Sequence, residues 1–210
     1  MEEVSQNWYA LKVFYNKVFE MEALLADIGI PSYLAVNKVP LKGQNHLIAR
    51  RHLARVEQEH GTDNRYIVDG PVIFRRVPMV NSLLFFRTEP ERLNEVEKLI
   101  ADPLGEGFNK GFIYKRTDWK EYAVIPQKQM DIFRLVTSSG VDGLDFYADD
   151  EITRYKQGDK VRVKDGPLKG AEGYIKRIKK DRRLLVCIEG IIAVATSYIP
   201  PEQLEIVKEE

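Results

Sequence analysis

Residues 158–175 read GDKVRVKDGPLKGAEGYI, and the predicted fold is built outward from this stretch. Val161 and Val163 alternate with basic residues, which is the pattern of a strand with one buried face. After a Gly-Pro turn, Gly170 and Gly173 interrupt the next apolar run, where a bulge or a close backbone approach would exclude a Cβ atom. Short strands with glycine corners predict a small β-barrel. The stretch has no nucleophile with a base partner and no set of metal ligands, so no catalytic role is expected.

The same stretch resembles a KOW motif. The positions that carry the resemblance are Gly158, Asp159, Val161, Val163, Gly166, Pro167, Lys169, Gly170 and Gly173. The resemblance implies an SH3-like barrel whose glycines shape the fold more than they touch a ligand. Ribosomal proteins and transcription elongation factors both carry such motifs, so this stretch alone leaves two classes of function open.

Composition predicts a soluble globular protein. The chain is 44% hydrophobic and 30% charged, and no apolar run approaches the ~20 residues that span a bilayer. The first six residues lack the basic and apolar regions of a signal peptide. The single cysteine, Cys187, lies in an apolar segment and has no partner for an internal disulfide. We therefore expect a cytoplasmic protein without a membrane partner.

The formal net charge of zero conceals a basic region near the C-terminus. Between Arg154 and Arg183 there are 12 Lys and Arg residues against 4 Asp and Glu residues. This excess predicts a positive surface that contacts nucleic acid or an acidic protein; the alternative is a solvated surface that protects edge strands. The candidate nucleic-acid contacts in this region are Lys179, Lys180, Arg182 and Arg183.

The N-terminal part alternates strand and helix patterns. Residues 8–15 are apolar on both parities, which indicates a strand covered on both faces, and a helical pattern follows up to Gly29. Leu83 to Phe86 repeat the two-faced pattern, and a helix after Pro90 would cover one face. Either another helix or a partner protein must cover the second face. Further strands are expected at 112–114 and 122–125, before a short helix after Pro126.

Residues 42–65 interrupt this order. They hold all three histidines, whose spacing does not place two ligands on one helical face, so no metal site is predicted. We interpret the segment as an inserted helix or a mobile excursion. Its basic residues Arg50, Arg51 and Arg55 are candidate phosphate contacts, the alternative being a decorated surface. The Asp69-Gly70 pair beyond it predicts a β-hairpin.

Taken together, the order of these parts resembles the NusG family. The resemblance rests on Trp8-Tyr9 opening a strand, on the apolar strand after Val77-Pro78-Met79-Val80, and on the KOW motif beyond an acidic linker. The runs at 77–87 and 126–130 are similar to UpxY-type paralogues of capsule-forming Bacteroidetes. The resemblance implies an α+β protein: an N-terminal NusG-type (NGN) antiparallel sheet with helices at 1–138, a flexible linker at 139–152 and a KOW domain at 153–210.

The resemblance also implies a function. NusG-type factors bind the clamp helices of elongating RNA polymerase through an apolar groove and suppress pausing or termination. Carried over by position, the contacts are Trp8, Tyr9, Val80, Leu83 and Phe85. The family usually has proline before this strand and tyrosine within it, where this chain has Asn81 and Leu83. The KOW domain would take a ribosomal protein or a termination factor. The 42–65 insertion would reach non-template DNA or polymerase, and nascent RNA is a further candidate partner of the protein.

An enzyme is not predicted, and no cofactor is expected. The chain has no phosphate-binding loop ending in Gly-Lys-Ser/Thr and no Ser/His/Asp arrangement. The remaining alternative is a ribosome- or RNA-associated KOW protein that binds through its basic barrel. The apolar strand Leu83–Phe86 favours the transcription factor, because an RNA-binding module needs no second apolar face there.

Overall fold

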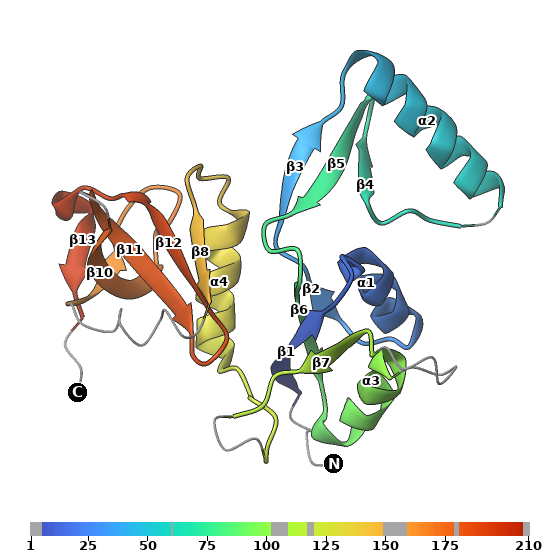
Figure 1. Cartoon of the computed structure of the whole chain (residues 1–210). Helices are drawn as coiled ribbons and strands as arrows, with labels where there is room; N and C mark the ends of the chain where they lie inside the picture. The colour runs from blue at the N-terminus through green and yellow to red at the C-terminus, as the bar shows by residue number, and fades with distance from the viewer. Residues whose placement is uncertain are drawn as a thin grey trace, which may run out of the picture.

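The structure, a computed structural model, describes residues 6–59, 61–101, 109–116, 120–148, 159–178 and 181–207. Figure 1 shows an N-terminal sheet with its helices, a lobe that projects from that sheet, and a curled sheet near the C-terminus. Two helix-bearing antiparallel sheets and a third antiparallel sheet make this a mixed α and β protein.

The N-terminal sheet has four antiparallel strands in the order β2-β6-β1-β7. Their bounds are β2 Ser32–Tyr33, β6 Leu83–Thr88, β1 Asn7–Val13 and β7 Gly111–Ile113. Successive side chains of a strand point to opposite faces of the sheet, and in the central strands β1 and β6 both sets are apolar. This is the pattern of strands that are covered on both faces. The pairing of Ala10 with Phe85 and of Tyr9 with Phe86 fixes which side chains share a face.

One face of this sheet carries Tyr9, Leu11, Leu84 and Phe86, and two helices cover it. Helix α1 (Val18–Asp27) and helix α3 (Leu93–Ile100) bury apolar residues at helical spacing against this face. A short 3-10 turn, η1 (Pro90–Arg92), precedes α3 because proline suits the start of a helix. The predicted helix after Pro90 is confirmed.

The opposite face, which carries Trp8, Ala10, Leu83 and Phe85, packs against helix α4 (Gln127–Ser138); we call it the α4 face. The ring centroids of Phe85 and Phe133 lie 5.1 Å apart. The prediction that both faces need cover is therefore confirmed, and a helix of the chain itself covers this one. The strand expected at 122–125 is wrong, since this segment forms only two isolated bridges, from Tyr122 to Lys115 and from Ile125 to Trp8.

The lobe consists of residues 36–78 and contains a three-stranded antiparallel sheet and one helix; we call it the α2 lobe. The strands are β3 Val36–Pro40, β5 Val72–Pro78 and β4 Tyr66–Asp69, in that order, and the helix is α2 Gly43–Gln58. The Asp69-Gly70 hairpin is confirmed, with Gly70 at φ 54. Of the two interpretations of residues 42–65, the inserted helix is the one that the structure contains.

The C-terminal sheet has six antiparallel strands in the order β13-β9-β10-β11-β12-β8. Their bounds are β13 Leu204–Ile206, β9 Lys160–Val163, β10 Glu172–Ile178, β11 Asp181–Ile188, β12 Ile192–Tyr198 and β8 Asp145–Ala148, with a 3-10 turn, η2 Pro201–Gln203, before β13. The sheet curls on itself in Figure 1. Among the described residues, the outermost strands β13 and β8 do not pair with each other, so the sheet is curled but open.

The expected linker at 139–152 contains strand β8, which pairs with β12 along its whole length. Arg183 strengthens this attachment by donating to the Gly143 carbonyl at 2.6 Å and to the Asp145 carboxylate. One continuous apolar cluster joins the α4 face, α4 and the C-terminal sheet. The two halves of the chain are thus in contact through α4, as Figure 1 also shows.

Candidate interaction surfaces

Three of the predicted partner contacts are buried beneath α4. Trp8 and Leu83 are buried, and the side chain of Phe85 is only 1% exposed. The indole Nε1 of Trp8 donates to Oε1 of Gln127 on α4 at 3.1 Å. A partner protein therefore cannot reach these three side chains while α4 stays in place.

Tyr9, the fourth predicted partner contact, is also inaccessible, but for a different reason. It lies on the opposite face of the sheet, stacked on Phe86 with ring centroids 5.5 Å apart, beneath α1 and α3. Neighbouring residues in a strand point to opposite faces, so Trp8 and Tyr9 cannot serve one surface. The expectation that both contact the same partner is wrong.

Polar contacts hold α4 on the sheet along its whole length. Near its C-terminal end, the hydroxyl groups of Tyr33 and Thr137 are hydrogen-bonded at 2.7 Å. The guanidinium of Arg134 lies over the rings of Tyr33 and Trp8, at 5.4 and 5.9 Å from their centroids. Burial in this contact raises the pKa of the Tyr33 hydroxyl. These contacts, added to the Phe85–Phe133 packing, make α4 an integral part of the N-terminal fold.

Beyond α4, the margin of the same sheet carries four aromatic side chains, which we call the aromatic strip: Phe14, Tyr15, Phe112 and Tyr114. Tyr15 and Phe112 are exposed, and Phe14 and Tyr114 are half-buried. Their rings form a chain of contacts, with centroids 6.1 Å apart for Phe14–Tyr15, 5.9 Å for Phe14–Phe112 and 5.3 Å for Phe112–Tyr114. Phe112 is 41% exposed and Tyr15 is 63% exposed. Because Phe112 pairs with Lys12, it lies on the α4 face of the sheet. An exposed aromatic cluster of this kind is typical of protein interfaces.

The backbone at one end of the strip is unusual. Tyr15 and Asn16 have φ angles of 58 and 55, in the left-handed region that residues with a Cβ rarely adopt. This turn places the Tyr15 ring outside the core, next to Phe14. Sequence reasoning missed the strip because it assigned residues 8–15 to a single strand. Phe112 and Tyr114 are two residues apart, so in the expected strand 112–114 their side chains lie on the same face. This spacing could have predicted the strip.

Val80 is the predicted contact that remains partly accessible. It lies in the turn between β5 and β6 and packs against the apolar cluster beneath α4. In this turn the Ser82 carbonyl accepts a 2.8 Å hydrogen bond from the Val13 amide, which brings the turn beside the strand end that carries Phe14. Val80 and the aromatic strip therefore lie along the same margin of the α4 face.

The predicted basic contacts near the C-terminus separate on the structure. Lys179 and Lys180 lie outside the described residues, and Arg182 is exposed. Arg183 is buried, and its guanidinium donates to Gly143, Asp145, Ala195 and Thr196. Arg183 as a nucleic-acid contact is therefore wrong, because its side chain is buried and each of its three guanidinium nitrogens donates to another group of the chain.

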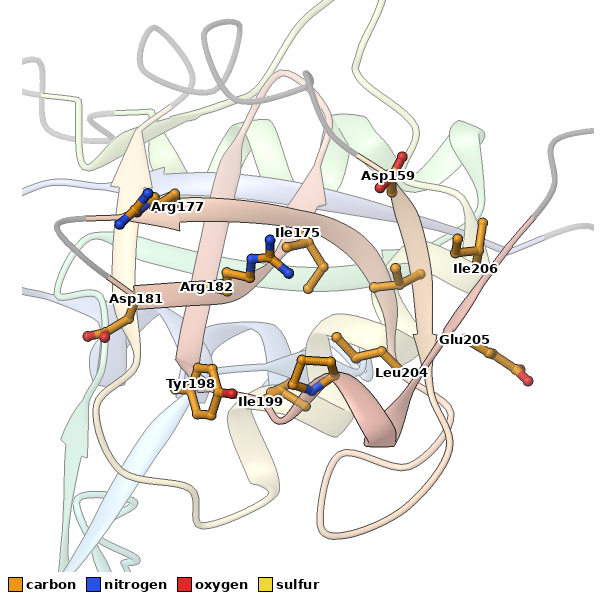
Figure 2. A pocket seen from close by; sticks show the side chains of 12 residues that line it. Asp159, Ile175, Arg177, Asp181, Arg182, Tyr198, Ile199, Leu204, Glu205 and Ile206 are labelled. Atoms are coloured by element: carbon orange, nitrogen blue, oxygen red, sulfur yellow. The ribbon is translucent and has the colours of Figure 1, made fainter.

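Arg182 lines an open groove on the C-terminal sheet with a volume of about 880 Å³. Figure 2 shows Arg177, Asp181 and Tyr198 at one end of the groove, and Glu205 and Ile206 at the other. Ile175, Ile199, Leu204 and the Arg182 side chain lie between these ends in Figure 2, and Val161 also lines the groove. The charges around the groove are mixed, with acidic and basic groups side by side. Such a rim suits a protein segment better than a polyanion.

The residues of the KOW resemblance are structural in the described part of the chain. Val161 and Val163 are buried, and Gly166 and Gly170 have positive φ angles of 82 and 90. A Cβ added to Gly173 would lie 2.3 Å from the Leu185 carbonyl oxygen, so the predicted close backbone approach is confirmed. Of the other motif residues, Pro167 and Lys169 are exposed, and Asp159 lines the groove. Gly158 lies outside the described residues.

A carboxylate of the C-terminal sheet joins the two halves of the chain. Glu172 is buried, and its Oε2 lies 2.7 Å from Nζ of Lys128 on α4, while its Oε1 lies 2.6 Å from Nη2 of Arg162. These cations lower the pKa of Glu172, with Lys128 the largest cause. Nearby, the Glu189 amide donates to Oε1 of Gln129 on α4 at 3.3 Å.

In the described part of the chain, no group of three or more His, Cys, Asp or Glu side chains lies close enough to hold a metal ion. Nor does any described helix have the length and apolar character needed to cross a membrane.

The chain has a weak likeness to known structures and no match among family models or curated proteins. Among solved structures, the chain is similar to one described as "Domain interaction in Thermotoga maritima NusG". The two share 15% sequence identity at a TM-score of 0.41, over 97% of this chain and 98% of that chain. A likeness at this level does not establish a family.

Proposed function

We propose that this protein is a NusG-type transcription elongation and antitermination factor that binds RNA polymerase in the cytoplasm. The observation that carries the proposal is the aromatic strip. It lies on the margin of the sheet face that, in the NusG resemblance, receives the clamp helices. Large aromatic side chains dominate the binding energy of protein interfaces because they bury much area at a low entropic cost.

The proposed polymerase contacts differ from those carried over by position. Trp8, Leu83 and Phe85 hold α4 on the sheet and support the surface from beneath. Val80 and the aromatic strip form the surface itself. This division explains why the strand 83–86 is apolar on both faces in a protein whose partner contacts only the margin.

The C-terminal sheet is proposed to take a second partner in its groove, as the KOW resemblance implies. The partner would be a ribosomal protein or a termination factor, and the mixed charges around the groove favour a protein. The similarity to UpxY-type paralogues supports a specialised role on polysaccharide operons. The same mixed charges disfavour the alternative of an RNA-associated KOW protein, because Asp159, Asp181 and Glu205 would repel phosphates.

The first test replaces Phe112 by aspartate and measures capture of purified core RNA polymerase by the tagged full chain. Phe112→Asp introduces a charge on the exposed strip without creating a core cavity, so binding should weaken at least tenfold while thermal unfolding changes little. Val68→Asp is the matched control, because Val68 is also exposed, at 61%, but lies in the α2 lobe.

Equal polymerase capture by Phe112→Asp and the unmodified chain would contradict the proposed surface. Phe85→Asp is not an informative substitute. It would place a charge against Phe133 in the core, at a cost of several kcal/mol, and any loss of binding would reflect unfolding.

A further inference from the structure

Helix α2 presents a face that is basic over its first three turns, and its one acidic residue, Glu57, lies in the last turn, two turns beyond Arg50. No Asp or Glu occurs from Leu41 to Val56, and the whole α2 lobe carries eight Lys and Arg residues against four Asp and Glu residues. Figure 1 shows α2 on the outside of the lobe, with the three strands between it and the C-terminal sheet. A polyanion can therefore approach this face without meeting another part of the chain.

The inner side of α2 is firmly seated. Ala49 is buried against the lobe together with Ile73 of β5. His46 Nε2 donates to the Pro71 carbonyl at 3.0 Å, and His52 Nε2 donates to Asp63 at 2.7 Å. The outer side of the helix is consequently fixed in direction, and its side chains are presented on a rigid element.

The outer side combines apolar and polar residues along one line. At 3.6 residues per turn, Gln44, Leu47, Arg51 and Ala54 are stacked along this line, and all four are exposed. Leu47 is 56% exposed, and its neighbour Ile48 is 57% exposed. Leu47 and Ile48 add apolar surface beside the arginines, so this side of the helix offers a ligand both charged and apolar groups.

Arginines flank this line on both sides. Arg50 lies to one side and Arg55 to the other, with Arg51 between them. In the described part of the chain, none of these three guanidinium groups forms an ion pair. By contrast, Arg65 and Arg76 of the same lobe pair with Asp63 and Glu22. The α2 arginines thus keep their charge available for an external anion.

We propose that the outer face of α2 binds double-stranded DNA, with the helix in the major groove. The groove is about 12 Å wide and admits an α-helix, so Arg50 and Arg55 would reach phosphates on its two walls. Gln44 and Arg51 would face base edges, and Leu47 would contact thymine methyl groups. A-form RNA is excluded by its deep, narrow major groove. The proposal stands apart from polymerase binding, since it needs only this face and a duplex.

The test measures binding of the full chain to a fluorescent 20-base-pair DNA duplex by anisotropy, over a range of salt concentrations and without polymerase. Each phosphate contact contributes about 0.9 to the slope of log affinity against log salt. The double variant Arg50→Gln/Arg55→Gln should therefore lower this slope by about two and weaken binding on the order of tenfold or more. Leu47→Asp should abolish binding, because it puts a carboxylate at the centre of the face.

The matched control is Lys17→Gln/Lys98→Gln, which removes two exposed charges outside the lobe and should leave the slope nearly unchanged. Circular dichroism confirms that each variant keeps its helices. Equal slopes for the two double variants would overturn the proposal, as would no duplex binding at 50 mM salt. Single-stranded DNA or duplex RNA bound as tightly as duplex DNA would also overturn it, as would competition by polyglutamate as strong as by unlabelled duplex. The α2 variants should lose duplex binding and still capture polymerase fully, which would show that DNA binding by α2 is independent of polymerase binding by the aromatic strip.

Discussion

Gly173 shows how one residue type can be required by a neighbouring backbone. Its amide unit packs so closely on β11 that a methyl group would overlap the Leu185 carbonyl oxygen, at 2.3 Å. We expect Gly173→Ala to destabilise the C-terminal sheet by about 2–3 kcal/mol, because the overlap is with backbone that cannot turn away. The measurement is the free energy of unfolding in urea, followed by far-UV circular dichroism.

Gly190→Ala is the matched control for this prediction. Gly190 has a positive φ of 76 but open space around its Cβ position, so the cost should be limited to backbone strain of about 1 kcal/mol. If Gly173→Ala cost no more than Gly190→Ala, steric overlap would not be the reason for glycine at position 173.

Single residues also mark where sequence reasoning succeeds and fails at this scale. The need for glycine at position 173 is predictable, because a glycine inside a strand pattern implies a close backbone approach. The burial of Arg183 is not predictable, because Arg183 belongs to a run of basic residues that are all expected to be exposed to solvent. Its acceptors come from residues 143–145 and 195–196, which only the folded sheet brings together.

At the scale of elements, the α2 lobe depends on a small polar cluster centred on Asp63. This carboxylate accepts hydrogen bonds from Arg65 and from His52 of α2, and its side chain is largely buried. The pKa of Asp63 is held well below its usual range, chiefly by Arg65 and further by His52. Asp63 therefore stays ionised in mildly acidic solution, and its contribution to the lobe is lost as pH falls below the ordinary aspartate value of about 3.9 and through this lowered pKa.

We predict that Asp63→Asn loosens α2 without affecting the rest of the chain. The neutral amide loses charge-assisted bonds and leaves buried donors poorly matched, which should cost about 1–3 kcal/mol. Amide hydrogen exchange in α2 should accelerate accordingly, while exchange in β10 and β11 stays constant. Asp69→Asn, in the exposed hairpin turn, is the control and should change α2 exchange little. Uniform acceleration across the molecule would show that the lobe is not an independent unit.

Elements with strong local signals were predictable, and elements defined by distant partners were not. The Asp69-Gly70 hairpin and the helices α1, α3 and α4 follow from turn chemistry and periodicity. Strand β8 was assigned to a linker because its four residues lie in an acidic, glycine-containing segment. It becomes a strand because the edge of β12 offers unpaired backbone groups, a fact that local sequence does not contain.

For the whole molecule, the two-sided role of α4 is the feature that sequence could not supply. Its Phe133 side packs on the N-terminal sheet, and its Lys128 and Gln129 side contacts the C-terminal sheet. A 12-residue amphipathic pattern predicts a helix with a buried face, but not which distant surfaces it joins. The same helix covers Phe85 and leaves the aromatic strip open, so the arrangement of the halves also decides which predicted contacts a partner can reach.

This arrangement makes the contact between α4 and the C-terminal sheet dependent on pH. Because Lys128 and Arg162 lower the pKa of Glu172, the ionised form favours the docked arrangement. The contribution is complete at neutral pH and is lost as pH falls below the ordinary glutamate value of about 4.3 and through the lowered pKa. Its size is modest, below about 1 kcal/mol for the Lys128 pair, since the Lys128 side chain is 69% exposed and screened by water.

We predict that Glu172→Gln, at pH 7, lowers the fraction of molecules in which α4 contacts the C-terminal sheet, as acidification does in the unmodified chain. The radius of gyration from X-ray scattering should rise slightly, and its change as the pH falls below about 4.3 should flatten. Glu205→Gln is the matched control: Glu205 also pairs with Arg162, at 3.4 Å, but among the described residues it forms no ion pair or hydrogen bond with α4. If Glu205→Gln reproduced the effect, the cause would be the charge of the C-terminal sheet. If neither variant changed the radius of gyration or its pH dependence, apolar packing through α4 alone would hold the halves together.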